Sequence, residues 1–164
     1  MTTGRGPWWK GTRGEGYLAG QLALMALVFL GPRAAPGWPA WPSVFAGPAS
    51  IAGVLLMLMG GLLLFAGGAR LGARLTPLPY PKDRSTLIVT GPYRWVRHPM
   101  YGGGILLAFG WAMAVHGSLT FGYAVALAVF LDVKSRREER WLSERYPEYA
   151  DYRTRVHKLI PFVY

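Results

Sequence analysis

Two long apolar runs dominate the first half of the chain. The first, Tyr17 to Leu30, extends toward Ala35 if the Arg33 side chain reaches back to the membrane interface. The second, Ala49 to Gly68, has 20 residues and no charge. As a helix, at about 1.5 Å per residue, it covers roughly 30 Å, the thickness of the hydrocarbon core of a bilayer. Both runs therefore predict transmembrane helices.

The second half contains two shorter apolar runs, Tyr101 to Val115 and Leu119 to Val133, with His-Gly-Ser between them. This spacing predicts a tight helical hairpin. Each run covers only about 22 Å as a helix, which is short for a full crossing. Local thinning of the bilayer or flanking interfacial residues can close the difference.

The segments between these runs are polar or rich in proline. Trp38 and Trp41, in the loop after the first run, suit a membrane interface. Residues 71–100 carry too many arginines to lie in lipid, and "STLIVTG", residues 85–91, predicts a short extended piece. From Lys134 onward the pattern predicts an amphipathic cytoplasmic tail.

The predicted fold is all-α, a polytopic membrane helix bundle in one domain, residues 1–164. It has about four transmembrane helices, of which the last two form the short hairpin. Composition agrees, because 52% of the residues are hydrophobic and only 16% are charged, against about 25% charged in soluble domains. There is no cysteine and the three histidines are scattered, so neither a disulfide framework nor a metal site is predicted.

The net charge of +10 is typical either of a nucleic-acid binder or of a membrane protein with basic cytoplasmic edges. With four spans, 17 of the 18 Lys and Arg residues fall on one side, and Arg33 is the exception. This pattern predicts a multi-pass protein of the plasma or inner membrane, with both termini cytoplasmic and no nucleic-acid partner. The alternative is a signal peptide in the first run. It leaves three spans, and the basic residues then no longer fall on one side of the membrane.

The first candidate for chemistry is "GPYRWVRHPMYGGG", residues 91–104. Pro99 suits the first turn of a helix, whose free N–H groups attract a carboxylate or phosphate. Arg97 and His98 add donors at the same depth. The glycines at 102–104 indicate close approach of a ligand or of another helix. Alternatively, the arginines are ordinary basic anchors and the glycines a helix-packing surface.

Two further segments follow the fourth run. In "REERWL", Glu138 and Glu139 lie beyond the lipid if the helix continues, where a carboxylate can hold an ammonium group or ribose hydroxyls. The alternative is a solvated helix with Glu–Arg pairs. In "RYPEYADYRTRV", tyrosines recur every three residues from Tyr146 and are followed by Arg153 and Arg155. The tyrosines predict a small docking core or an aromatic wall for a flat ring.

Together these segments resemble a known family. "GPYRxVRHPxYxG", an apolar hairpin and "EE..L....P.EY..Y..RV...IP" are similar to the isoprenylcysteine carboxyl methyltransferase and phospholipid methyltransferase superfamily, over residues 87–162. The resemblance implies an integral membrane methyltransferase that uses S-adenosylmethionine. The substrate of the family does not carry over, so the acceptor is expected only to be a lipophilic small molecule or lipid with a carboxylate or an amine. Membrane lipids are the expected surroundings, and a protein partner is left open. Residues 1–86 match only as apolar spans, so 87–164 would form the cofactor-binding half.

The resemblance also implies roles for individual residues. The catalytic residues would be Arg97, Arg155 and Glu139, with the two arginines near the acceptor. The cofactor-binding residues would be His98, Pro99, Tyr101, Gly102, Gly104, Glu138, Glu139, Tyr149 and Tyr152. No metal is required, because methyl transfer is an in-line displacement that depends on positioning and on exclusion of water.

Two rival functions are kept open. Membrane sterol-type reductases that use NADPH have a similar C-terminal region with a comparable "HPxY" segment, but they are usually much longer. The other rival is a non-catalytic membrane subunit that has retained the fold.

The resemblance generates a first prediction. His98→Ala and Glu139→Ala should each abolish binding of S-adenosylmethionine while the protein stays folded in detergent. Isothermal titration of the purified variants measures the affinity, and thermal unfolding checks the fold. Retained affinity in both variants would overturn the site assignment.

Overall fold

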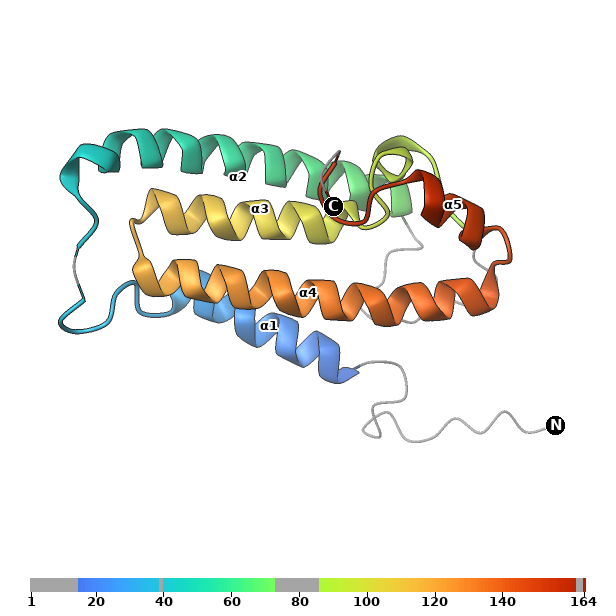
Figure 1. Ribbon diagram of the computed structural model, residues 1–164, viewed down its shortest axis with the longest axis horizontal. Coiled ribbons are helices and arrows are strands. Elements are labelled where there is room, and N and C mark those ends of the chain that lie inside the picture. Colours follow the sequence, from blue (N-terminus) through green and yellow to red (C-terminus); the bar gives the residue numbers. More distant parts are fainter. Residues whose placement is uncertain (1–14, 39, 73–85, 162–163) are drawn as a thin grey trace.

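The computed structural model describes residues 15–38, 40–72, 86–161 and 164, and all regular elements in these ranges are helical (Figure 1). They are α1 (Glu15–Leu30), α2 (Ser43–Leu71), the 3-10 turn η3 (Gly91–Arg94), α3 (Pro99–Ala114), α4 (Ser118–Arg145) and α5 (Tyr149–Arg155). The all-α prediction is confirmed. Six of the basic residues counted above, Arg5, Lys10, Arg13, Arg74, Lys82 and Arg84, lie outside the described ranges.

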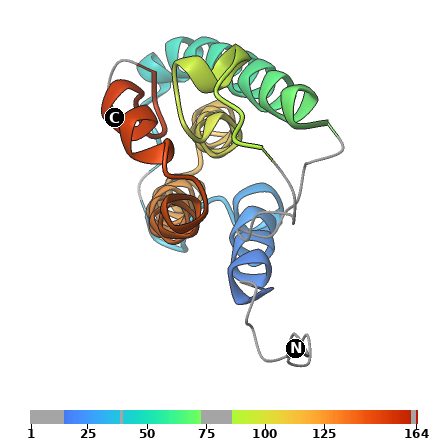
Figure 2. The same ribbon diagram turned by 90° about the vertical axis from the view of Figure 1, so that its right-hand side faces the viewer.

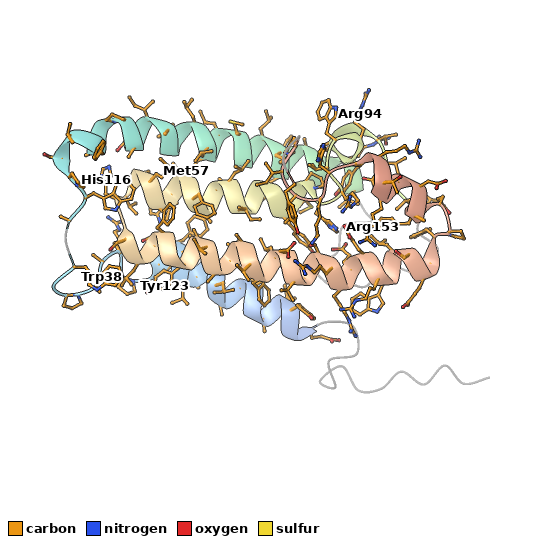
Figure 3. The ribbon with its side chains drawn as sticks, viewed as in Figure 1. Trp38, Met57, Arg94, His116, Tyr123 and Arg153 are labelled. Carbon is orange, nitrogen blue, oxygen red and sulfur yellow. The ribbon has the colours of Figure 1, made fainter. Side chains whose placement is uncertain are left out.

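The four long helices run alternately in opposite directions (Figure 1). One end of the bundle gathers the start of α1, the end of α2, the start of α3 and the end of α4. Figure 3 places Arg94 and Arg153 at that end, and Trp38 and His116 at the other. The Arg33 carbonyl accepts a hydrogen bond from the Leu119 amide at this second end, 3.0 Å away. The arrangement thus places Arg33 at the opposite end of the bundle from Arg94 and Arg153.

The outer face of α2 is apolar and exposed. Its 29 residues include Ile51, Leu58, Leu62 and Phe65, with exposed fractions of 66%, 66%, 69% and 73%. An apolar surface of this length indicates contact with lipid rather than with water. Within the described ranges, α2 and α4 are long and apolar enough to cross a bilayer, and α1 is a shorter apolar helix.

Glycines spaced seven residues apart let α2 and α3 approach closely. A Cβ atom built on Gly60 would lie 2.6 Å from the Gly103 carbonyl oxygen, and one built on Gly103 would lie 2.6 Å from the Gly60 oxygen. Gly53 and Gly110 repeat this reciprocal contact one heptad along. Small residues at such crossings allow backbones to meet, which is typical of helix packing in membranes. The helix-packing interpretation of the glycines is therefore correct for Gly103.

The helix α1 packs against α4, where the Phe130 ring lies over Gly20. The central core combines α1, α3, α4 and the C-terminal segment. Its buried residues are Val28, Ile105, Ala108, Ala124, Leu127, Leu131 and Leu159. This core fixes α3 between α2 and α4, and it places the start of α3 beside the polar part of α4.

The hairpin of α3 and α4 turns through Val115, His116 and Gly117, as expected, but its second arm is longer than predicted. The helix α4 has 28 residues and continues twelve residues beyond Val133. Polar side chains support this extension. The Arg136 guanidinium pairs with the Asp132 carboxylate one turn earlier, and the Ser143 hydroxyl donates to the Glu139 carbonyl oxygen at 2.7 Å. The first part of the predicted tail is therefore a continuation of α4.

The end of the chain returns to the start of α3. The backbone amides of Arg97 and His98 donate to the carbonyl oxygens of His157 and Lys158, at 2.8 and 3.0 Å. A single parallel bridge joins Val96 to His157. The extended piece predicted at 85–91 forms no strand in its described part, 86–91, and Ser85 lies outside the described residues. Extended pairing occurs instead at Val96, where the tail supplies a partner.

The glycine contacts generate a second prediction. Gly60→Ala should lower the thermal unfolding midpoint in detergent by several degrees, because the added methyl group meets the backbone of α3, which cannot rotate away. The matched control is Gly61→Ala, since no atom lies within 4 Å of a Cβ at Gly61. That substitution should leave the midpoint unchanged or raise it slightly, because alanine favours the helix. Equal midpoints for the two variants would contradict the close approach.

Candidate active site

A buried ion pair connects α4 to the segment before α3. The Arg97 Nε donates to Glu139 Oε1 at 2.8 Å, and the His98 Nε2 lies 3.2 Å from the same oxygen. The Arg97, His98 and Glu139 side chains are all less than a tenth exposed. A buried charge needs such partners, because an unpaired one loses its hydration without compensation.

Arg97 also holds the C-terminal segment. Its Nη1 donates to the carbonyl oxygen of Arg153 at 3.0 Å and to that of Val156. One guanidinium therefore ties together the start of α3, the extension of α4 and the end of α5. This arrangement uses most of the donors of Arg97 within the protein.

The ionisation of Glu139 reflects this environment. Glu139 lies in the polar part of α4, six residues beyond the last apolar residue of the fourth run. Burial alone raises the pKa of Glu139, but hydrogen bonds and charge from His98 and Arg97 outweigh it and lower the pKa to about 2. Glu139 is accordingly a carboxylate throughout the physiological range.

Glu138 belongs to a different contact set. The Tyr101 hydroxyl donates to Glu138 Oε2 at 2.9 Å, and His98 Nδ1 lies 3.6 Å from this oxygen. The His98 and Tyr101 rings stack, with centroids 5.3 Å apart and planes inclined by 4°. The sequence-predicted residues His98, Tyr101 and Glu138 thus form one polar wall.

This wall closes one end of a cavity of about 320 Å³. The polar lining consists of Gln21, Tyr93, Arg97, His98, Tyr101, Lys134 and Glu138. The remaining lining is Met25, Phe29, Leu64, Leu71, Met100, Gly104, Leu127 and Leu131. The cavity is therefore amphipathic, with a polar part and an apolar part of its lining.

The three glycines at the start of α3 face three different neighbours. A Cβ on Gly102 would lie 2.1 Å from the Leu159 carbonyl oxygen, so Gly102 admits the C-terminal segment. Gly103 faces α2, as described above. Gly104 lines the cavity, and no atom lies within 4 Å of its Cβ position. Pro99 is buried at the first position of α3 and packs near Gly67. The helix-packing interpretation thus holds for Gly103, whereas Gly104 lies on the wall of the cavity.

Tyr149 and Tyr152 lie in a second core rather than on the cavity wall. With Tyr146 they form a buried cluster, packed by Leu87, Leu142 and Val156. The Tyr152 hydroxyl donates to the Tyr93 carbonyl oxygen at 2.5 Å, whereas the buried Tyr149 hydroxyl has no hydrogen-bond partner among the described residues. Burial raises the pKa of both phenols, so they stay protonated. Their placement matches the interpretation of the tyrosines as a small docking core.

The structure does not bring Arg155 to the ion pair. Arg155 is exposed on α5, and its Nε donates to the Asp151 carbonyl oxygen at 3.2 Å. Arg153 is the nearer residue, with its Nε 3.8 Å from Glu139 Oε2. It lines a second, more open hollow of about 440 Å³ together with Glu139 and Lys158. Residues two positions apart on a helix point in nearly opposite directions, which explains why only Arg153 approaches Glu139.

Sequence reasoning missed three polar residues of the cavity, Gln21, Tyr93 and Lys134. Lys134 is 1% exposed, its Nζ donates to Gln21 Oε1 at 2.6 Å, and it lies 5.1 Å from the centroid of the Tyr101 ring. The sequence contained a signal for Gln21 and for Lys134. Gln21 interrupts an otherwise apolar run, and Lys134 precedes Glu138 by one helical turn.

The sequence profile of the phospholipid methyltransferase family matches residues 48–149. The chain belongs to this family. The matched range contains the α2–α3 crossing, the RHPMY segment and the Glu138–Glu139 pair, so the family resemblance found in the sequence is confirmed.

Several curated proteins are also similar to this chain. The protein-S-isoprenylcysteine O-methyltransferase of Rattus norvegicus is 29% identical over 119 residues, which is 70% of this chain and 42% of that protein. The cobalt-zinc-cadmium resistance protein CzcN of Cupriavidus metallidurans is 33% identical over 81 residues, which is 49% of this chain and 38% of that protein. This phospholipid methyltransferase family member thus spans about two fifths of the length of these relatives.

A solved structure supports the fold. The eukaryotic intramembrane Ras methyltransferase ICMT aligns with 92% of this chain and 53% of its own, with a TM-score of 0.63 and 21% identity. The family, these relatives and this fold together identify a membrane-embedded methyltransferase-type helix bundle.

The Arg97–Glu139 pair generates a third prediction, on pH. The folded state lowers the pKa of Glu139 to about 2, from about 4.3 in the unfolded chain. The ion pair therefore contributes its full stabilisation at pH values above the unfolded-state pKa. This stabilisation should disappear as the pH falls from there toward 2. Thermal unfolding in detergent at a series of pH values measures it.

The matching variant is Glu139→Gln, which keeps the shape and removes the charge. It should be less stable than wild type at pH 7 and should lose less on acidification. Glu144→Gln removes an exposed carboxylate from the same helix and should follow the wild-type profile. If Glu139→Gln and wild type showed parallel acid profiles, the ion pair would not be the source of the pH dependence.

Proposed function

We propose that this chain is an integral membrane methyltransferase that uses S-adenosylmethionine and methylates a lipophilic acceptor at the cytoplasmic face. The observation that carries the proposal is the amphipathic cavity, whose polar lining includes the RHPMY segment and Glu138. Such a cavity suits one polar and one apolar ligand that meet inside it.

The residues at the polar end fit the cofactor. Glu138 is a carboxylate acceptor for an ammonium group, held in place by the Tyr101 hydroxyl. Gly104 leaves the wall open where any larger side chain would occupy space. Tyr101 and His98 offer flat surfaces, already stacked on one another. When bound, S-adenosylmethionine supplies an electrophilic methyl group.

The apolar end suits the acceptor. The apolar lining includes Met25 and Phe29 of α1, Leu127 and Leu131 of α4, and Leu64 of α2. In the end view of Figure 2, α1 lies beside α4 while α2 lies beside α3. We infer that the acceptor enters sideways, between α1 and α2. Since α1 supplies one wall, we infer that it is a retained span rather than a cleaved signal.

We further infer that all four long helices cross the membrane, with the polar end of the cavity and both termini in the cytoplasm. The basic residues at the end that carries Arg94 and Arg153 favour this orientation (Figure 3). A polar cofactor then reaches Glu138 from the water phase, while the acceptor stays in lipid. Residues 1–164 would act as one membrane domain.

The protein groups contribute by position. Arg97 and Glu139 hold the tail against α3 and orient His98 through the shared Glu139 oxygen. The buried walls exclude water from the place where the two ligands meet. For an in-line displacement, such positioning can supply most of the rate enhancement.

A fourth prediction tests the proposal. The purified protein in detergent should bind S-adenosylmethionine with micromolar affinity by calorimetry and should not bind NADPH. Glu138→Gln should weaken the affinity for S-adenosylmethionine at least tenfold, because it removes the charge that meets the ammonium group. Glu144→Gln, exposed on the same helix, should leave the affinity unchanged.

Binding of NADPH instead would favour the reductase. Binding of neither cofactor would favour a non-catalytic membrane subunit. Equal affinities for Glu138→Gln and wild type would remove Glu138 from the cofactor site.

A further inference from the structure

The open hollow of about 440 Å³ carries an excess of positive charge. Its lining includes one carboxylate, Glu139, and four cationic side chains, Arg97, Arg136, Arg153 and Lys158. The cations come from the segment before α3, from α4, from α5 and from the segment after α5. Asp132, which pairs with Arg136 and Lys158, adds a second carboxylate next to the hollow. Four cations against two carboxylates leave a surplus of two positive charges among these side chains.

Two of the four cations are accessible from solvent. The side chains of Arg136 and Arg153 are 64% and 60% exposed, whereas those of Arg97 and Lys158 are 9% exposed. Arg136 contacts Asp132 through its Nε and Nη2 atoms. A guanidinium has five N–H donors in a planar fork that matches a phosphate group. Arg136 therefore has donors left for a ligand, and it shares the hollow with a second exposed guanidinium.

A stripe of exposed apolar residues on α4 leads to this hollow. This valine stripe consists of Val125, Val129 and Val133, which are 43%, 60% and 47% exposed. Arg136 follows Val133 by three residues, about 4.5 Å along the helix axis. Residues at intervals of four and three share one helical face. Because α4 is long and apolar enough to cross a bilayer, this face presents apolar side chains to lipid and a guanidinium where the apolar run ends.

We propose that the hollow and the valine stripe bind an anionic phospholipid of the surrounding bilayer. Its phosphate would lie at Arg136 and Arg153, and one acyl chain would lie along the stripe. Basic pockets beside transmembrane helices suit such headgroups. The positive surplus favours an anionic head over a zwitterionic one, whose ammonium would be repelled. The stripe favours a lipid over a free phosphate, since a free phosphate has no group to contact it.

This lipid is distinct from the methyl acceptor. We place the acceptor in the 320 Å³ cavity, to which α4 contributes the buried Leu127 and Leu131 instead of the exposed valines. The Arg97 side chain lines both spaces, so the bound phospholipid would lie beside the candidate site. The inference goes beyond the proposed function, and it requires only that α4 crosses the bilayer.

The test measures binding to the full chain in dodecyl maltoside, without S-adenosylmethionine. The probes are dimyristoyl phosphatidylglycerol, dimyristoyl phosphatidylcholine with the same chains, and glycerol phosphate, which has no chains. Thermal unfolding over a range of probe concentrations gives the affinity for each. We expect phosphatidylglycerol to bind wild type at least tenfold more tightly than phosphatidylcholine does. Glycerol phosphate should not stabilise the protein.

Two double variants of equal net charge locate the site. Arg136→Gln combined with Arg153→Gln should weaken the phosphatidylglycerol affinity at least tenfold, because each arginine near an anionic head adds to binding. The matched control combines Arg94→Gln with Arg137→Gln. Both of these arginines are exposed, and neither lines the hollow. The control should keep the affinity within twofold of wild type, which separates a site from general attraction to a basic surface.

The assignment is overturned if phosphatidylglycerol does not stabilise wild type, or if phosphatidylcholine does so equally well. It is also overturned if the two double variants bind phosphatidylglycerol equally. Binding of glycerol phosphate as tightly as phosphatidylglycerol would indicate a site for a soluble phosphate and would overturn the lipid. The comparison of the three probes on wild type decides the matter even if the variant at Arg136 and Arg153 does not fold.

Discussion

The buried pair of Arg97 and Glu139 is the interaction on which the polar end of this protein depends. Arg97 lies just before α3. Glu139 lies about six turns into α4. The same guanidinium holds two carbonyl oxygens near the end of α5. Since a buried charge without its partner is strongly unfavourable, the three segments are coupled. The His98–Tyr101–Glu138 wall forms where this coupling places it.

Backbone contact in the membrane part supports the same geometry. Gly53 and Gly60 of α2 meet α3 at its carbonyl oxygens, which fixes the depth of α3 in the bundle. Gly102 then admits the C-terminal segment, and Gly104 leaves room in the cavity. The helix α3 thus contacts the C-terminal segment, α2 and the cavity through three consecutive glycines, residues 102–104. Any side chain at Gly102 or Gly103 would separate two of these layers.

Family membership and the lining of the cavity give two separate kinds of information about this protein. Membership of the phospholipid methyltransferase family, and similarity to isoprenylcysteine O-methyltransferases, indicate methyl transfer in a membrane. The cavity adds structural detail, because its lining combines the polar wall of His98, Tyr101 and Glu138 with apolar residues of the neighbouring helices. A bundle that spans the bilayer can present both walls at once, one to water and one to lipid.

The sequence by itself determined the all-α membrane class, the four helical segments and the motif segments. These follow from local hydrophobic periodicity, charge and residue order, which do not depend on distant contacts. It also brought His98, Tyr101 and Glu138 together through the family resemblance. Only the tertiary structure decided that α4 continues to Arg145, that Arg153 rather than Arg155 lies near Glu139, and that Gln21 meets Lys134 across 113 positions of the chain. Such pairings arise from packing between helices, and the residue pattern of one helix does not specify which residues of another helix it contacts.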